Sequence, residues 1–116
     1  MTADQRFRPQ DRIRKRSDYK ALYDRARKIP SRSFVLFVAK NDQGRPRLGI
    51  TVTRRIGGAV RRNRGKRLLR EIFRKHKSEL QDVDIVVNAR LPLPDAALRR
   101  LETEFLLCLK PYLKRS

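Results

Sequence analysis

Arginine and lysine dominate residues 57–71, GGAVRRNRGKRLLRE, and their spacing suits the binding of a polyanion. Asn63, Lys66 and Arg70 stand at i, i+3 and i+7, so a helix places all three on one edge. Lysine and arginine bind phosphate groups, and asparagine binds a base edge or fixes the backbone. Like charges at this density repel one another unless a polyanion supplies the counter-charge. The segment therefore predicts a nucleic-acid site, against the alternative of an ordinary solvated basic helix.

The sequence lacks the residues that a protein nuclease acting alone would use. Such an enzyme needs clustered carboxylates that hold a metal ion, or a histidine pair for acid–base catalysis. The nearest acidic pair, Asp82 and Asp84, is expected in a turn at the solvated edge of a strand. The single histidine, His76, is expected to pack at a helix end, and the single cysteine, Cys108, has no partner at metal-ligand spacing. We therefore expect no catalytic residue, metal site or cofactor in the protein alone, and chemistry supplied by a partner.

Hydrophobic periodicity predicts the elements that must position these residues. In chain order they are a helix at 17–26 with Ser17 as N-cap, strands at 33–40 and 47–55, a helix at about 59–77, a strand at 84–90 and a helix at 95–110. Pro30 is expected to end the first helical region. This order predicts an α+β fold, a small single-domain α/β sandwich in which three helices pack against one central sheet. The domain is expected to span residues 1–116, with 1–16 loosely ordered until bound.

The long central helix separates its apolar residues from its cations. On a helical wheel of about 100° per residue, one stripe is apolar and the opposite side is basic. The stripe that we expect to be buried contains Gly65, Leu68, Leu69, Ile72, Phe73 and His76. The cations of this helix are therefore abundant, and they are also separated from its apolar stripe.

The whole chain is basic, with 31 lysines and arginines against 12 acidic residues among 116, for a net charge of +19. Because periodic apolar runs accompany this charge, it indicates a folded nucleic-acid-binding domain, with an anionic membrane surface as the second choice. No run approaches the roughly 18 apolar residues of a membrane span. The first residues also lack the apolar core of a signal peptide. We therefore expect a cytoplasmic protein.

Residues 48–71, LGITVTRRIGGAVRRNRGKRLLRE, resemble the signature of the bacterial ribonuclease P protein subunit. The shared pattern is a strand that ends in two cations, a Gly-x-Ala-Val entry, and Arg-Asn-Arg at 62–64 before a Lys-Arg-Leu-Leu-Arg run. The resemblance extends to RSDYKALYDRARKIPSRSFVLFV (16–38), to DIVVNAR (84–90) and to the closing helix. Gly58 departs from the usual pattern, where asparagine is common, as does Gly65, where a branched apolar residue is common. Neither departure removes a charge.

The resemblance implies a binding subunit of a ribonucleoprotein enzyme. In that family the protein is the small partner of a catalytic RNA, which uses bound Mg²⁺ to cut the 5′ leader from precursor tRNA. The implied partners are the ribonuclease P catalytic RNA and precursor tRNA, and neither a membrane nor DNA. The implied fold is a ribosomal-type α/β sandwich with a left-handed βαβ crossover, contrary to the usual right-handed rule.

The resemblance also implies a cleft for the leader, in which bases stack on aromatic rings beside a basic wall. The expected leader-binding residues are Tyr19, Tyr23, Phe37, Asn63, Lys66 and Arg70. The alternative is that the aromatic residues belong to the core. Phe34 and Phe37 point to opposite faces of their strand, so one of the two is a core residue. The hydroxyl groups of Tyr19 and Tyr23 favour a site in contact with water.

The remaining cations around the helix are then available to the catalytic RNA, so that one helix serves two RNAs. These are Arg54, Arg55, Arg61, Arg62, Arg64 and Arg67. A rival hypothesis is a ribosomal or general RNA-binding protein, which would not prefer leader-bearing precursor to mature tRNA. A DNA-binding helix-turn-helix would need a second helix close to the basic one, where strands are expected. A membrane-surface helix would want large apolar residues opposite its cations and no dedicated sheet.

Overall fold

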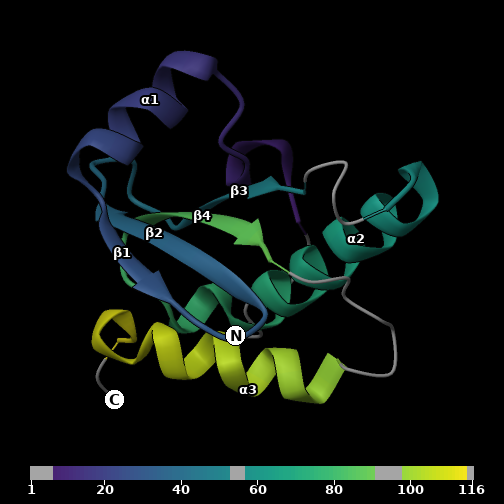
Figure 1. The fold of residues 1–116 in the computed structure, drawn as a ribbon. Helices are drawn as coiled ribbons and strands as arrows, with labels where there is room; N and C mark the ends of the chain where they lie inside the picture. Colours follow the sequence, from purple (N-terminus) through teal and green to yellow (C-terminus); the bar gives the residue numbers. More distant parts are fainter. Residues whose placement is uncertain (1–6, 53–56, 91–97, 115–116) are drawn as a thin grey trace.

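The computed structural model describes residues 7–52, 57–90 and 98–114. They form a four-stranded sheet with helices on both faces (Figure 1). The strands are β1 (Arg27–Pro30), β2 (Phe34–Lys40), β3 (Arg47–Thr51) and β4 (Val83–Ala89). The helices are α1 (Arg16–Arg25), α2 (Ala59–His76) and α3 (Leu98–Cys108), and the short 3-10 turns are η1 (Pro9–Asp11), η3 (Lys77–Glu79) and η5 (Lys110–Tyr112). The predicted α+β sandwich with three helices is confirmed.

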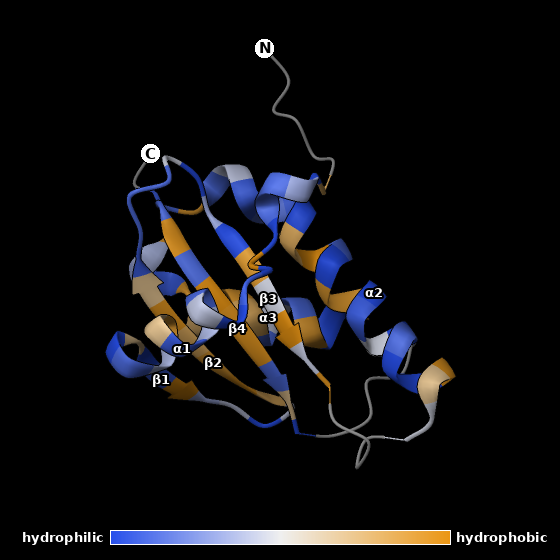
Figure 2. Ribbon diagram, turned by 90° about the horizontal axis from the view of Figure 1, so that it is seen from above, coloured by the Kyte–Doolittle hydropathy of each residue, from blue (hydrophilic) through white to orange (hydrophobic). Residues whose placement is uncertain are grey.

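The sheet has the strand order β1-β2-β4-β3. β2 pairs antiparallel with both β1 and β4, whereas β3 pairs parallel with β4. Two parallel neighbours need a long crossover between them, and α2 supplies it. In this strand order β3 is an edge strand, and the basic helix α2 lies beside it (Figure 2).

The main core lies between one face of the sheet and the helices α2 and α3. Side chains alternate along a strand, so Phe34, Leu36 and Val38 of β2 all point into this core and are almost fully buried. From α2 the buried residues are Gly65, Leu68, Leu69, Ile72 and Phe73. This is the predicted apolar stripe apart from His76, which is half-buried at the end of the helix. In Figure 2 the strands are mainly hydrophobic, whereas hydrophilic and hydrophobic residues alternate along α2.

The opposite face of the sheet is covered by α1, through Leu22, which packs with Ala39 and Val86. Part of the segment that the sequence predicts to be loosely ordered also packs here. Ile13 is buried in the same cluster, and its backbone N–H donates to the Leu48 carbonyl of β3 at 3.0 Å. The chain before α1 thereby runs along the open edge of β3, because an apolar side chain and an unpaired strand edge both favour that contact.

The structure differs from the secondary-structure predictions in two places. β1 was not predicted, because only Ile29 of its four side chains is even half-buried; Pro30 is tolerated there because β1 is an edge strand. The N-cap of α1 is Lys15, without a side-chain hydrogen bond, so Ser17 lies inside the first turn. The last part of the strand predicted at 47–55 and the start of the helix predicted at 95–110 fall partly outside the described residues.

Asp84 is buried, and the prediction of a solvated strand edge was wrong for it. The Arg47 guanidinium donates to both carboxylate oxygens of Asp84, at 2.8 and 2.7 Å, and the Asn41 side-chain amide donates at 2.7 Å. The Asp84 side chain supplies the hydrogen bond that raises the pKa of Arg47, against the lowering effect of burial. The carboxylate therefore joins β3, β4 and the turn after β2.

His76 is held between two carboxylates at the end of α2. Its Nδ1 lies 2.8 Å from Glu79 Oε2, and its Nε2 lies 2.7 Å from Glu102 Oε2 of α3. Burial lowers the pKa of His76, but the hydrogen bonds to Glu102 and Glu79 raise it by more, so the net shift is upward. Both ring nitrogens are engaged, which suits a link between helices. The described residues include no helix that could cross a membrane and no group of three metal-binding side chains.

Candidate nucleic-acid interface

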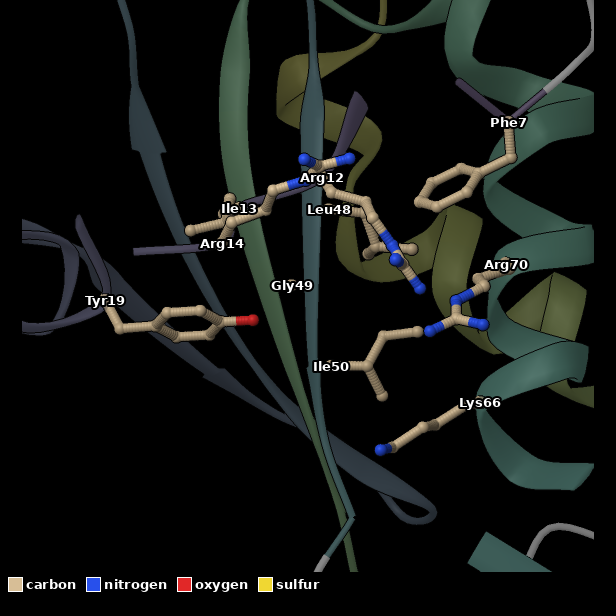
Figure 3. Close-up of a pocket in the computed structure, with 10 residues that line it drawn as sticks. All are labelled: Phe7, Arg12, Ile13, Arg14, Tyr19, Leu48, Gly49, Ile50, Lys66 and Arg70. Atoms are coloured by element: carbon tan, nitrogen blue, oxygen red, sulfur yellow. The ribbon is translucent and has the colours of Figure 1, made fainter. Parts of the chain in front are cut away.

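A cavity of about 270 Å³ lies where the N-terminal segment, α1, β3 and α2 meet (Figure 3). Tyr19 of α1 lines one side, and Lys66 and Arg70 of α2 line the other. Arg12 and Arg14, from the segment that precedes α1, also line it. The fold thereby brings together three of the predicted leader-binding residues from positions nearly fifty residues apart. Four cations and two aromatic rings, those of Tyr19 and Phe7, therefore line the cavity.

Tyr19 is placed by a glycine in the neighbouring strand. A Cβ built on Gly49 of β3 would lie 2.6 Å from the Tyr19 hydroxyl oxygen and 2.8 Å from its Cζ. Only glycine therefore leaves room for the ring, whose hydroxyl points toward Gly49 in Figure 3. Burial, followed by the proximity of Tyr23, raises the pKa of Tyr19, while a hydrogen bond from the Ile50 backbone lowers it. Tyr19 is thus a protonated phenol at neutral pH, held against the backbone of β3.

Arg12 and Arg70 face each other around the ring of Phe7. Their guanidinium carbons lie 5.9 and 6.0 Å from the ring centroid, within the range of cation–π contacts. Phe7 itself packs edge-on against Phe73 of the core, with centroids 5.8 Å apart. Burial, then repulsion from Arg12, lowers the pKa of Arg70, although the group stays charged at neutral pH. Two like charges held this close to one cavity favour an anion as its occupant.

A second cavity, of about 390 Å³, continues along α2. Asn63, Lys66, Arg67 and Arg70 all line it, and Lys66 and Arg70 line the first cavity as well. The predicted edge of Asn63, Lys66 and Arg70 is therefore one surface in the structure. Arg67, which was expected to face the catalytic RNA, shares this surface with the expected leader-binding residues.

Tyr23 and Phe37 form an aromatic pair on the face of the sheet that carries α1. Their ring centroids are 4.8 Å apart and the planes are nearly perpendicular, an edge-to-face arrangement. Tyr23 is 39% exposed, so it is not a core residue. Tyr19 and Phe37 are half-buried and pack against the smaller core cluster of Ile13, Leu22, Ala39 and Val86. Each is therefore partly a core residue and partly exposed, so neither of the two alternatives holds alone for them. Neither Tyr23 nor Phe37 lines the two cavities described above.

The other expected RNA-binding cations lie on the first turns of α2 or before it. Arg61 and Arg64 are exposed and Arg62 is half-buried. The Nε atom of Arg62 is buried and has no hydrogen-bond partner within the described part of the chain. Arg54 and Arg55 lie outside the described residues.

The sequence did not single out three residues of the first cavity, Phe7, Arg12 and Arg14, because they precede the first predicted element. One signal was present. Arg12 and Arg14 alternate around Ile13, which is the spacing of an extended segment with one side chain buried and two exposed. A short extended segment of this kind gives too little periodicity to separate it from a loop.

Comparison with known proteins places the chain among ribonuclease P proteins. A family model described as Ribonuclease P matches residues 7–112. The ribonuclease P protein component of Staphylococcus epidermidis is 44% identical over 85 residues, which cover 72% of this chain and 74% of that protein. The ribonuclease P protein component of Syntrophus aciditrophicus is 46% identical over 81 residues, covering 69% and 68%.

Solved structures of ribonuclease P proteins have the same fold. The Staphylococcus aureus protein matches with a TM-score of 0.77 at 35% identity, covering 87% of this chain and 94% of that chain. The Thermotoga maritima protein matches with a TM-score of 0.75 at 32% identity, covering 86% and 96%. The fold, the basic helix and the match over residues 7–112 agree, and the chain belongs to the ribonuclease P protein family.

Proposed function

We propose that this chain is the protein subunit of ribonuclease P and binds both the catalytic RNA and the 5′ leader of precursor tRNA. Membership of the family implies a role in tRNA 5′ processing. The observation that supports the finer statement is the cavity beside β3, where four cations surround a space next to Tyr19. Phosphate groups bind to such cations, and single-stranded bases stack on aromatic rings nearby.

The leader is proposed to follow the surface from α1 to α2. Lys66 and Arg70 bind its phosphates, and Asn63 contacts a base edge or the backbone beside them. Tyr19, Tyr23 and Phe37 supply aromatic surface on the α1 side. Burial and, after it, repulsion from Arg12 lower the pKa of Arg70, and an anion between the two guanidinium groups would relieve that repulsion.

The cations on the first turns of α2 are proposed to bind the catalytic RNA, together with the pair before the helix. These are Arg54, Arg55, Arg61, Arg62 and Arg64. Arg67 was expected to bind the catalytic RNA, and because it shares a surface with Asn63, Lys66 and Arg70 we propose that it can contact either RNA. Hydrolysis of the phosphodiester then belongs to the RNA subunit with its Mg²⁺, and the protein contributes binding and positioning. A cytoplasmic location stays a prediction.

Reconstitution with a bacterial ribonuclease P RNA tests this function. We expect the protein to lower the Mg²⁺ concentration needed to cleave precursor tRNA at the 5′ end of the mature sequence, because its cations replace part of the ionic screening. The protein alone should leave the same substrate intact. Cleavage by RNA-free protein would contradict the proposal, and equal affinity of the complex for precursor and mature tRNA would favour a general RNA-binding protein.

Replacing Gly49 with alanine is expected to weaken precursor binding about fivefold without unfolding the protein. The new methyl group displaces the Tyr19 ring, whose hydroxyl oxygen lies 2.6 Å from the position of that carbon. The loss is near the lower end of the roughly 1–3 kcal/mol that one stacking contact contributes. Affinity is measured for precursor and mature tRNA in complex with the RNA subunit.

Gly58→Ala is the matched control, because a Cβ at Gly58 meets nothing within 4 Å. The double variant Gly49→Ala with Tyr19→Ala should bind precursor as tightly as Tyr19→Ala alone, since both changes remove the same contact. Additive losses would show that Gly49 acts through something other than Tyr19.

A further inference from the structure

Asn88 is a polar residue at the end of the apolar strand β4, on the face that carries α1. In register it lies opposite Val35 of β2 and Thr51 of β3, while Val86, two residues earlier, lies opposite Phe37. Side chains at alternate positions share a face, so Asn88 and Val86 point to the same side as Phe37. Val86 is fully buried beneath α1, whereas Asn88 is half-buried. Asn88 therefore lies where the cover of α1 ends.

The oxygen of the Asn88 side-chain amide accepts a hydrogen bond from one member of the aromatic pair. The Tyr23 hydroxyl donates to Asn88 Oδ1 at 3.2 Å, and the Tyr23 ring packs edge-to-face against Phe37. Within the described part of the chain the Asn88 Nδ2 group donates no hydrogen bond, and it is not among the buried unpaired atoms. The Nδ2 group is thus accessible to solvent, and the hydrogen bond between Oδ1 and Tyr23 orients it.

This arrangement has the features of a base-reading site. A nucleotide that stacks on the exposed Tyr23 ring presents the edge of its base beside that ring. The Asn88 amide, which is hydrogen-bonded to the Tyr23 hydroxyl, is the polar group next to this edge. A half-buried amide with fixed orientation discriminates among bases, because each base presents a different pattern of acceptors and donors at its edges. The nearby cations bind phosphates, which are the same for every base.

We propose that Asn88 is a specificity-determining residue that donates through Nδ2 to the edge of one leader base stacked at Tyr23. The proposal rests on the proposed function, since it needs the leader to lie on this face of the sheet. It assigns to β4 a part in leader recognition that the basic helix does not supply. Tyr23 acts here both as a stacking surface and as the group that orients the amide.

The test is precursor binding by the complex of protein and RNA subunit, with each of the four bases placed in turn at each leader position. The wild type should prefer one base or pair of bases at one position. Asn88→Leu should reduce that preference about fivefold, the effect of one neutral hydrogen bond, and leave other positions unchanged. Asn88→Asp keeps the acceptor for Tyr23 but removes the donor, so it should change which base is preferred there.

Tyr23→Phe helps to distinguish recognition of the base by Asn88 from a role of Asn88 in holding the Tyr23 ring. It keeps the ring and removes the hydrogen bond to Asn88, so it should weaken the preference at the same position by less than Asn88→Leu does. If Asn88 only holds Tyr23 in place, Asn88→Leu will lower the affinity for all four bases equally, and the inference is overturned. Unchanged discrimination in both Asn88 variants overturns it as well.

Failure of the proposed function gives a different result. If the wild-type complex binds precursor and mature tRNA equally, the leader is not bound and both proposals are overturned. If it prefers the precursor but shows no base preference at any position, only the role of Asn88 is overturned. Melting temperatures of the variants are measured in parallel, and Asn88→Asp, which conserves the side-chain size, supplies the test if leucine impairs folding.

Discussion

Replacing Lys66 and Arg70 together with alanine is expected to weaken precursor binding at least about 100-fold at low salt. Each side chain is proposed to make a charged hydrogen bond to a leader phosphate, and such contacts contribute about 1.5–3 kcal/mol each. The dependence of log affinity on log salt should also flatten by about 1.4, since a single-strand phosphate contact contributes roughly 0.7 to the slope. Both residues line both cavities and lie off the buried stripe of α2, so the fold should survive.

The measurement is the affinity of the RNA–protein complex for precursor tRNA over a salt series, with mature tRNA as the reference. The double variant Arg99→Ala with Arg100→Ala removes the same charge from exposed positions on α3, and should leave the difference between the two substrates unchanged. If both double variants lose the same affinity, net charge alone is acting. An unchanged slope for the Lys66 and Arg70 variant would place these cations against the RNA subunit or solvent.

Replacing Asp84 with alanine is expected to destabilise the protein by about 3 kcal/mol. Asp84 is 3% exposed, and its carboxylate accepts hydrogen bonds from Arg47 and Asn41. Removing it leaves the Arg47 guanidinium, whose side chain is 17% exposed, without its partner. Breaking a buried ion pair on one side costs about 3–5 kcal/mol, and the remaining exposure of Arg47 places the effect at the lower end. This is a large part of the roughly 5–15 kcal/mol by which small domains are stable.

Urea denaturation measures the change, with Asp82→Ala as the control because Asp82 is an exposed acid two residues away. Replacing Asp84 with leucine and Arg47 with methionine together should recover much of the loss, since no unpaired charge then stays buried. A loss below about 1 kcal/mol for Asp84→Ala would mean that water solvates Arg47 fully once the carboxylate is gone.

The elements with strong periodicity were predicted close to their observed bounds. α2 was expected at 59–77 and spans Ala59–His76, because its apolar residues recur at helical spacing over five turns. β2 and β4 were also predicted to within one residue, since runs of branched and aromatic residues favour strands. β1 was missed because an edge strand with four mostly exposed residues carries little burial pattern.

Local pattern could not predict which charged groups would meet. Asp84 and Arg47 are thirty-seven residues apart, and they pair because β3 and β4 are parallel neighbours with Arg47 in register with Asp84. In the sequence, Asn88 likewise interrupts an apolar run. No local pattern indicates that the Tyr23 side chain, which is sixty-five residues earlier, contacts it. Both contacts depend on strand order, which side-chain periodicity does not encode.

Sequence patterns were sufficient to predict the fold class, the buried stripe of α2 and the single edge that carries Asn63, Lys66 and Arg70. These follow from the helical and extended repeats, which are properties of a local segment. Three features depend on tertiary packing: Tyr19 faces Lys66 and Arg70, Arg12 and Arg14 line the same cavity, and Tyr23 instead contacts Phe37 and Asn88. The reason is that this surface is assembled from segments that lie far apart in the sequence. Its geometry depends on the order of strands in the sheet, on Gly49, which makes room for the Tyr19 ring, and on the N-terminal segment that pairs with the edge strand β3.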